Sequence, residues 1–148
     1  MNESALQLRS GNDTRDTLVA LLKAAADQLR LSVLRILRRD TFSVQELSQI
    51  LDVSQPGMSH HLKILANAGL VSTRREGSTI FYRRSHTARE AELAELQEAI
   101  LTSADLLTLD ANAEQQLALI NEARAENSRA FFEEHAGEFR RQQEQVVD

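Results

Sequence analysis

The side chains whose types and spacing suit recognition chemistry lie in one stretch, which runs from Ser54 to Leu65 and reads SQPGMSHHLKIL. It supplies hydroxyl, amide, imidazole and ammonium groups, and it contains neither a carboxylate nor a thiol. Such groups donate hydrogen bonds and attract anions. No Ser–His–acid order or phosphate-binding loop occurs elsewhere in the sequence. The pattern therefore favours binding to phosphates and base edges over catalysis, and we predict no catalytic residue, no cofactor and no enzyme activity.

Helical spacing divides this stretch into an apolar and a polar face. Pro56 suits the first turn of a helix, where its missing N–H has no intrahelical partner to lose, and Ser54 can cap the start. The apolar positions recur as on one stripe of a helix: Met58, Leu62, Leu65 and Ala66. The other side carries Pro56, His60, Lys63 and Asn67, with Ser59 on its flank. We interpret the stretch as a helix that enters a DNA major groove.

The segment before this helix predicts its partner in a helix-turn-helix. Ser43 and Glu46 have the S-x-x-E spacing of a capping box, in which each side chain binds the other residue's backbone N–H. A short helix from there to about Leu51 is followed by a turn at Asp52–Ser54. A short helix, a tight turn and a second helix with a basic outer face are typical of DNA-binding motifs.

The segment after it predicts a β-hairpin. Gly69 stands where the helix needs a C-terminal cap in the left-handed conformation. Two runs rich in β-branched and aromatic residues follow, 70–75 and 78–83, with Glu76-Gly77 between them. Of Phe81 and Tyr82, which alternate on one strand, one is expected in the core. Four arginines would place positive charge on the hairpin or its base: Arg74, Arg75, Arg83 and Arg84.

The rest of the chain predicts further helices in three parts. Residues 1–13 are expected to form a loose N-terminal arm. Residues 14–110 would form the DNA-binding and dimerisation domain, with helices from Asp13 or Thr14 to about Ala26, from about Gln28 to Arg39, and again from His86. Residues 111–148 would form a C-terminal helical extension, whose continuation past Gly137 is disfavoured and whose last residues, 140–148, are expected to fray. The predicted fold class is mainly α with a small β-hairpin.

Composition bounds the class of protein. The chain has 148 residues, ordinary hydrophobic and charged fractions of 42% and 26%, and no cysteine, which excludes disulfides, thiolate metal sites and thiol redox sensing. No apolar run approaches the ~18 residues needed to cross a bilayer, and residues 1–11 lack the apolar core of a signal peptide. We expect no membrane partner and a cytoplasmic location.

The net charge of −5 is unevenly distributed. Residues 31–85 carry eight Lys/Arg against four Asp/Glu, whereas residues 86–148 carry five against fourteen. Residues 1–30 are balanced, with four of each sign. The basic excess therefore coincides with the predicted helix-turn-helix and hairpin, as a surface that faces phosphates requires.

The order of turn, helix, cap and hairpin resembles the ArsR–SmtB family of bacterial winged-helix repressors. The resemblance is carried by Ser54-Gln55-Pro56, Ser59-His60-His61-Leu62-Lys63, Ala68-Gly69-Leu70-Val71, Gly77 and Tyr82, and it covers about residues 18–107. It implies a winged helix-turn-helix and a homodimer joined through the first helix and the long helix after the wing. It also implies a two-fold symmetric double-stranded DNA operator and release when an effector binds.

The resemblance and the polar face together give the candidate DNA-binding residues. Gln55 and Ser59 suit base edges or phosphate, Lys63 suits phosphate, and the N–H groups at the start of the helix suit a docked phosphate. His61 lies at the edge of the apolar stripe, so packing and DNA contact both stay open for it. The full set is Ser54, Gln55, Pro56, Gly57, Ser59, His60, His61, Lys63, Arg74, Arg75, Gly77 and Thr79.

The sequence departs from the family pattern where metals bind. Arsenic and lead sensors of the family bind the metal through a Cys-x-Cys pair, and Ser48 and Ile50 stand at those two positions here. The positions of the zinc ligands in zinc sensors of the family correspond to His86, Ala88, Ala99 and Thr102. Neither standard metal site is present, because three of those four residues are not strong ligands. The remaining metal candidates are His86 and Glu90, one helical turn apart.

Three hypotheses follow for regulation and context. The first is a repressor released by a non-thiolate effector, such as a small metabolite. The second is a metal-responsive repressor with an unusual His/carboxylate site at His86 and Glu90. The third is the DNA-binding front part of a methyltransferase fusion, because residues 127–139 resemble the linker that precedes the methyltransferase domain in such proteins. No strand–Gly-rich-loop–helix unit for S-adenosylmethionine occurs in this sequence.

Overall fold

The elements of the structure follow the predicted order, with a third strand added. The computed structural model describes the backbone of residues 3–146 and the side chains of residues 13–138 and 140. The elements are α1 (Glu3–Ala25), α2 (Gln28–Ile36), β1 (Phe42–Ser43), α3 (Val44–Leu51), α4 (Gln55–Asn67), β2 (Val71–Glu76), β3 (Thr79–Arg84), the 3-10 helix η1 (Ala91–Leu93), α5 (Ala94–Ala104) and α6 (Ala111–Val146).

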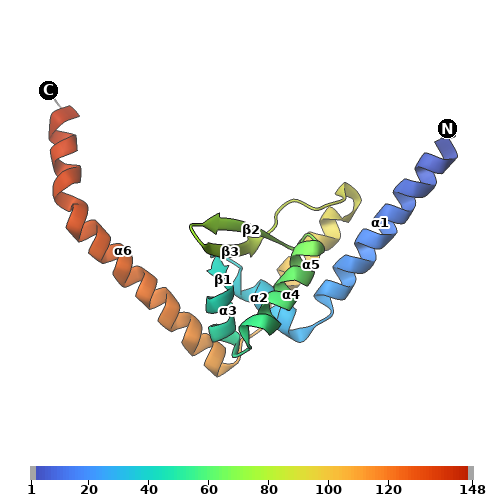
Figure 1. Cartoon of the computed structure of the whole chain (residues 1–148), viewed down its shortest axis with the longest axis horizontal. Helices are drawn as coiled ribbons and strands as arrows, with labels where there is room; N and C mark the ends of the chain where they lie inside the picture. The colour runs from blue at the N-terminus through green and yellow to red at the C-terminus, as the bar shows by residue number, and fades with distance from the viewer. Residues whose placement is uncertain (1–2, 147–148) are drawn as a thin grey trace.

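The central body consists of α2 to α5 and the sheet, and two long helices project from it. Figure 1 shows α1 and α6 leaving the body on opposite sides, so that the two ends of the chain lie far apart. Among the described side chains, α1 reaches the core through Leu21 and Ala24, and α6 reaches it through Ala113, with Leu117 and Ile120 packed against it. None of the described helices combines the length and the apolar content needed to cross a membrane.

The core is built from the predicted apolar faces. Met58, Leu62 and Leu65 of α4 are each 0% exposed, which confirms the predicted stripe. They pack with side chains from α2, α3, β1 and the residue before β2, among them Val33, Leu34, Phe42, Leu47, Ile50 and Leu70. Each buried Leu or Met contributes roughly 1.5–3 kcal/mol relative to an exposed position. This burial fixes the orientation of α4 and leaves its polar face outward.

The sheet is antiparallel with strand order β1-β3-β2. The predicted hairpin is confirmed, with Val71 paired to Arg84 and Glu76 to Thr79. The expectation of a hairpin alone was incomplete, because β1 adds a third strand through the pair Phe42 and Tyr82. A two-residue strand has no alternation to detect, and it forms only because β3 offers it a partner. Burial raises the pKa of the Tyr82 phenol, so its hydroxyl stays neutral near neutral pH.

Several helix boundaries differ from expectation. The loose arm predicted over residues 1–13 is wrong for residues 3–13, which are helical because α1 begins at Glu3. Extending an existing helix adds one hydrogen bond per ordered residue, and residues 3–9 include good helix formers. The helix predicted from Gln28 to Arg39 ends at Ile36.

The helix predicted from His86 begins only at Ala91, as η1, and continues as α5 to Ala104. The break between α5 and α6 ends at residue 110, since α6 starts at Ala111, and the Asp110 carboxylate accepts the N–H of Ala113 at 2.7 Å. The predicted stop at Gly137 and the fraying over 140–146 are wrong, because α6 passes through both and reaches Val146. A single glycine costs about 1 kcal/mol, which the flanking helical hydrogen bonds offset.

Candidate DNA-binding face

The start of α4 has the predicted cap. The Ser54 hydroxyl oxygen accepts the N–H of Gly57 at 3.2 Å, and Pro56 lies in the first turn. A Cβ atom at Gly57 would lie 3.1 Å from the Ser54 hydroxyl oxygen and 3.3 Å from a Val53 methyl. Glycine at this position therefore keeps the cap tight. Because Pro56 has no N–H and those of Gly57 and Met58 bind Ser54, the first turn leaves the Gln55 N–H to an anion.

The two ends of the helix-turn-helix are fixed by local chemistry. Ser43 and Glu46 form both hydrogen bonds of the capping box, at 3.2 and 3.0 Å. Gly69 follows the last turn of α4 with φ of +82°, and the Leu70 N–H donates to the Leu65 carbonyl at 3.0 Å. The buried Gln97 side chain of α5 donates to the Gly69 carbonyl at 3.2 Å. The recognition helix is thus held at both ends before any partner binds.

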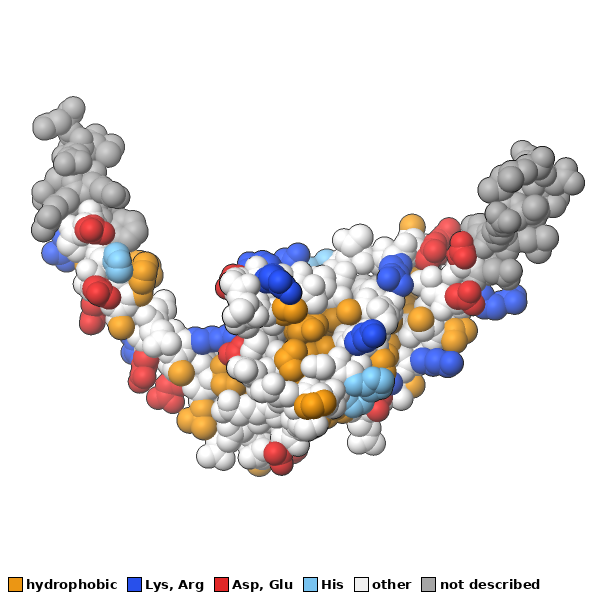
Figure 2. All heavy atoms as spheres, in the orientation of Figure 1, with side chains coloured by type: hydrophobic (Ala, Val, Ile, Leu, Met, Phe, Trp, Pro, Cys, Tyr) orange, Lys and Arg blue, Asp and Glu red, His pale blue; other side chains and the backbone are white. Residues whose placement is uncertain are grey.

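The polar side chains of α4 are exposed as predicted. Gln55, Pro56, Ser59, His60 and Lys63 are all exposed, while the opposite side of the helix is buried. Figure 2 shows Lys and Arg side chains on the face of the central body that carries the sheet and α4, Asp and Glu prominent on the described part of α6, and both signs on the described part of α1. The basic central body and the acidic α6 are therefore separated in space.

A hollow joins α4 to the wing. It has a volume of about 350 Å³ and is lined by Ser43, Val44, Gln45, Gln55, Ser59, Ser78, Thr79 and Ile80. Its polar lining consists of hydroxyl and amide groups without a carboxylate. Three of the candidate residues, Gln55, Ser59 and Thr79, are brought together here although 24 positions separate the first from the last. Groups of this kind bind phosphate oxygens or base edges.

The wing presents fewer free cations than predicted. Arg74 forms an exposed ion pair with Glu76, and Arg83 donates to the Ser72 hydroxyl at 3.2 Å. Arg75 is exposed and makes neither a hydrogen bond nor an ion pair with the described side chains. Gly77 lies at the tip with φ of +62° and has nothing within 4 Å of a built Cβ, so the backbone conformation alone requires glycine there.

Arg84 lies at the base of the hairpin as predicted, at the end of β3, but it is buried and so is not free to meet DNA. Its side chain is 8% exposed, its Nε donates to the Leu34 carbonyl at 2.7 Å, and its Nη2 binds the Asp105 carboxylate. The hydrogen bond from Arg84 holds the pKa of Asp105 below its ordinary value. Arg84 therefore ties the wing to α2 and to the end of α5.

His61 has an intramolecular role, one of the two left open by the sequence. Its Nδ1 lies 3.1 Å from the Arg30 guanidinium and 4.0 Å from the Asp27 carboxylate, and the side chain is half-buried. Arg30 also donates to the carbonyls of Lys23 and Ala24. This cluster joins α4 to α1 and α2, whereas His60 points into solvent. No sequence spacing indicated the role of Arg30.

The metal candidates do not have the expected geometry. His86 and Glu90 lie in an irregular segment before η1, so they are not one turn apart on a helix. His86 lines a small hollow with Arg38, Arg39 and Arg83, and these cations disfavour a metal ion. Within the described residues, no three His, Asp or Glu side chains gather as metal ligands would. Ser48 and Ile50 are both buried in the core.

A contact that the sequence did not reveal joins α6 to the helix-turn-helix. The Arg124 guanidinium binds both Glu46 carboxylate oxygens at 2.8 Å, donates to the Thr41 carbonyl at 3.0 Å and lies 4.6 Å from the centre of the Phe42 ring. Glu46 is also a member of the capping box of α3. The residues are 78 positions apart, so no local pattern could predict the pair.

Comparisons with known proteins agree with this geometry. Residues 27–73 match the family described as bacterial regulatory protein, arsR family, and this range contains α2, α3 and α4. The transcriptional activator HlyU of Vibrio cholerae is 47% identical over 73 residues, which span 49% of this chain and 68% of HlyU. The biofilm growth-associated repressor of Agrobacterium fabrum is 44% identical over 89 residues, which span 60% of this chain and 73% of that repressor.

A solved structure shares the architecture as well. The homodimeric winged helix-turn-helix DNA-binding domain of Mycobacterium bovis, a fragment of residues 1–100, superposes with a TM-score of 0.51 at 25% identity. The match covers 71% of this chain and 88% of that domain. Two findings agree. The sequence is similar to the relatives over more than two thirds of their length, and the structure is a winged helix-turn-helix. The chain belongs to the ArsR family of bacterial regulatory proteins.

Proposed function

We propose that this chain is a dimeric transcriptional repressor that binds operator DNA through α4 and the β2–β3 wing and releases it when a non-thiolate effector binds. As a member of the ArsR family it is a DNA-binding transcriptional regulator. The observation that carries the proposal is the division of α4, which buries Met58, Leu62 and Leu65 and exposes Gln55, Ser59 and Lys63 beside the wing.

Each exposed group has a role that its chemistry suits. The amide of Gln55 and the hydroxyl of Ser59 would contact base edges in the major groove, where each base pair presents a distinct pattern of donors and acceptors. The ammonium of Lys63 and the Gln55 N–H at the start of α4 would contact phosphates. Arg75 would reach the neighbouring minor groove or its phosphates from the wing.

Dimerisation through α1 and α5 would double this surface. The Mycobacterium bovis neighbour is homodimeric, and α1 here exposes Val19 and Leu22, at 43% and 47% of their surface. A two-fold dimer would place two α4 helices in successive major grooves, roughly 34 Å apart, and so would require a palindromic operator. A regulator of this kind acts in the cytoplasm, where bacterial DNA lies.

The relatives named above include an activator and a repressor. We place this chain with the repressors, because a dimer seated across an operator blocks access to that DNA. The effector would not be held by thiolates, since the chain has no cysteine.

Operator binding by alanine variants tests the proposal. Labelled DNA from upstream of the chain's own gene is titrated with the protein at several salt concentrations, and binding is measured by fluorescence anisotropy. The titrations give the affinity and its salt dependence. Lys63→Ala should weaken binding to all sequences and reduce the slope of log K against log salt by about 0.9 for each protomer, or about 1.8 for the dimer. Gln55→Ala should also relax the sequence preference, with a loss of about 1–3 kcal/mol on the preferred base pair.

Arg129→Ala on α6 is the control, because it removes one positive charge from an exposed position away from α4 and α1. It should bind as the parent does. Parent-like binding by both Lys63→Ala and Gln55→Ala would show that α4 is not the recognition helix.

A further inference from the structure

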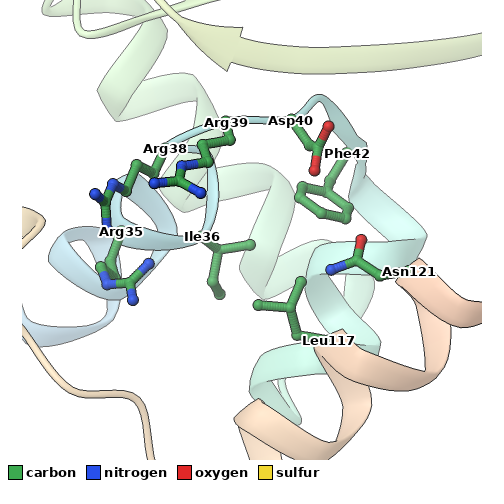
Figure 3. A pocket seen from close by; sticks show the side chains of 8 residues that line it. All are labelled: Arg35, Ile36, Arg38, Arg39, Asp40, Phe42, Leu117 and Asn121. Carbon is green, nitrogen blue, oxygen red and sulfur yellow. The ribbon is translucent and has the colours of Figure 1, made fainter.

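A second hollow lies between the end of α2, the strand β1 and the first half of α6, and we call it the α2–α6 pocket (Figure 3). Its volume is about 220 Å³, and it contains none of the candidate DNA-binding residues. Ile36, Phe42 and Leu117 provide an apolar lining. The polar lining is Arg35, Arg38, Arg39, Asp40 and Asn121.

The polar groups of the pocket favour an anion. Figure 3 shows the three arginine side chains on one side, with Phe42, Leu117 and Asn121 across from them and Ile36 between. Arg35 already donates to the Leu107 carbonyl at 3.1 Å, and Arg38 lies 4.0 Å from the Asp105 carboxylate. Arg39 forms neither a hydrogen bond nor an ion pair with any described side chain. An anion can therefore bind Arg39 without displacing an internal partner.

The apolar lining and the amide restrict the kind of anion. Asp40 is the opposing charge, so the anionic group must approach from the arginine side and stay away from that carboxylate. The Asn121 carboxamide can donate a hydrogen bond to a second oxygen. The partly buried Leu117 would contact a hydrocarbon body, which an inorganic anion lacks, and the buried Ile36 and Phe42 form the floor beneath it. We propose that the α2–α6 pocket binds a small organic carboxylate with an apolar body, and that this ligand is the effector of the regulator.

The pocket shares a wall with the helix-turn-helix. Phe42 contacts the Arg124 guanidinium on α6, and Arg124 binds Glu46, which caps α3. Phe42 also pairs with Tyr82 of the wing strand β3. A ligand that touches Phe42, Leu117 and Asn121 would therefore shift the joint between α6, α3 and the wing.

The effector role rests on the proposed function, because it assumes operator binding. The factor by which the ligand changes the affinity for operator DNA equals the factor by which operator DNA changes the affinity for the ligand. The affinities measured with and without the second partner must therefore agree.

Isothermal titration calorimetry with sodium benzoate and sodium hexanoate tests the site directly on the full chain, at constant ionic strength. Both carboxylates should bind, and inorganic phosphate at the same concentration should not. Arg39→Gln and Asn121→Ala should each weaken carboxylate binding by about tenfold, as expected for loss of one charge-assisted or well-placed hydrogen bond. Both residues are exposed and have no internal partner among the described residues, so the fold should persist. Arg129→Gln, which removes the same charge from α6 outside the pocket, should bind as the parent does.

Anisotropy with operator DNA then tests regulation. Benzoate or hexanoate at a concentration equal to the parent's Kd should weaken operator binding by the parent and by Arg129→Gln, and should have a much smaller effect on Arg39→Gln. Parent-like carboxylate binding by both Arg39→Gln and Asn121→Ala would overturn the site. Equal binding of phosphate would overturn the ligand class.

Carboxylate binding without any change in operator affinity would overturn the effector role. If the parent binds no operator at all, the proposed function fails and the effector role falls with it, while calorimetry still decides the site. The two failures are therefore distinguishable.

Discussion

Arg84 and Lys63 have the same formal charge, but the fold uses them differently. Lys63 is exposed on α4 and free to meet a phosphate. Arg84 is buried, and its charge is compensated by Asp105 and the Leu34 carbonyl. A buried cation that loses its partner is costly, because desolvation is no longer offset. The stability of the wing therefore depends on Asp105.

Replacing Asp105 by asparagine should lower the free energy of unfolding at pH 7 by about 1–3 kcal/mol, the range for a hydrogen bond between charged groups. The folded-state pKa of Asp105 lies below its ordinary value of 3.8. A carboxylate with a depressed pKa contributes stability above its unfolded pKa and loses it as pH falls through the folded value. The difference between parent and variant should therefore stay constant down to about pH 4 and shrink below it.

Urea unfolding at several pH values measures this difference, with Asp16→Asn as the control because Asp16 is exposed on α1. A pH-independent deficit would mean that the Arg84–Asp105 pair is not its source.

At the scale of elements, the sequence predicts what is local. The capping box of Ser43 and Glu46, the cap at Ser54 and the glycine after α4 are all encoded within a few residues, and all are present. Strand β1 and the Arg124–Glu46 pair were missed, because each depends on a partner far along the chain. The lengths of α1 and α6 were underestimated because a helix extends past weak residues once its packed part has formed.

Two glycines in helical contexts predict opposite effects of the same substitution. Gly69→Ala forces a φ of +82° on an alanine and brings its Cβ to 3.2 Å from the Arg89 side chain, so the free energy of unfolding should fall by about 1–2 kcal/mol. Gly137 lies within α6 with nothing within 4 Å of a built Cβ. Gly137→Ala should stabilise α6 by about 1 kcal/mol, the difference in helix propensity.

Circular dichroism during thermal unfolding checks both variants. Gly69→Ala should lower the Tm of the main transition, while Gly137→Ala should increase helicity at moderate temperature. Equal effects of the two substitutions would contradict the helix ends assigned to α4 and α6.

At the scale of the whole molecule, the charge distribution and the two projecting helices support one arrangement. The acidic α6 would repel DNA, so the basic central body would face it, while α1, whose charges balance, would take part in the contact between protomers. Leu22 of α1 is 47% exposed and adjoins the buried Leu21, which anchors α1 to its own body. A dimer would cover Leu22 and leave Leu21 unchanged.

Leu22→Glu should therefore give a folded monomer. The substitution adds a charge at a position that is exposed in the single chain, so its effect on the monomer fold should stay within about 0.5 kcal/mol. In a dimer the same carboxylate would be buried without a partner, which costs several kcal/mol. Sedimentation velocity should show a monomer, and operator affinity should fall steeply because one half-site contact is lost. Leu119→Glu, at a position of α6 that is 50% exposed, should remain dimeric. A Leu22→Glu protein that stays dimeric, beside a monomeric Leu119→Glu protein, would move the interface from α1 to α6.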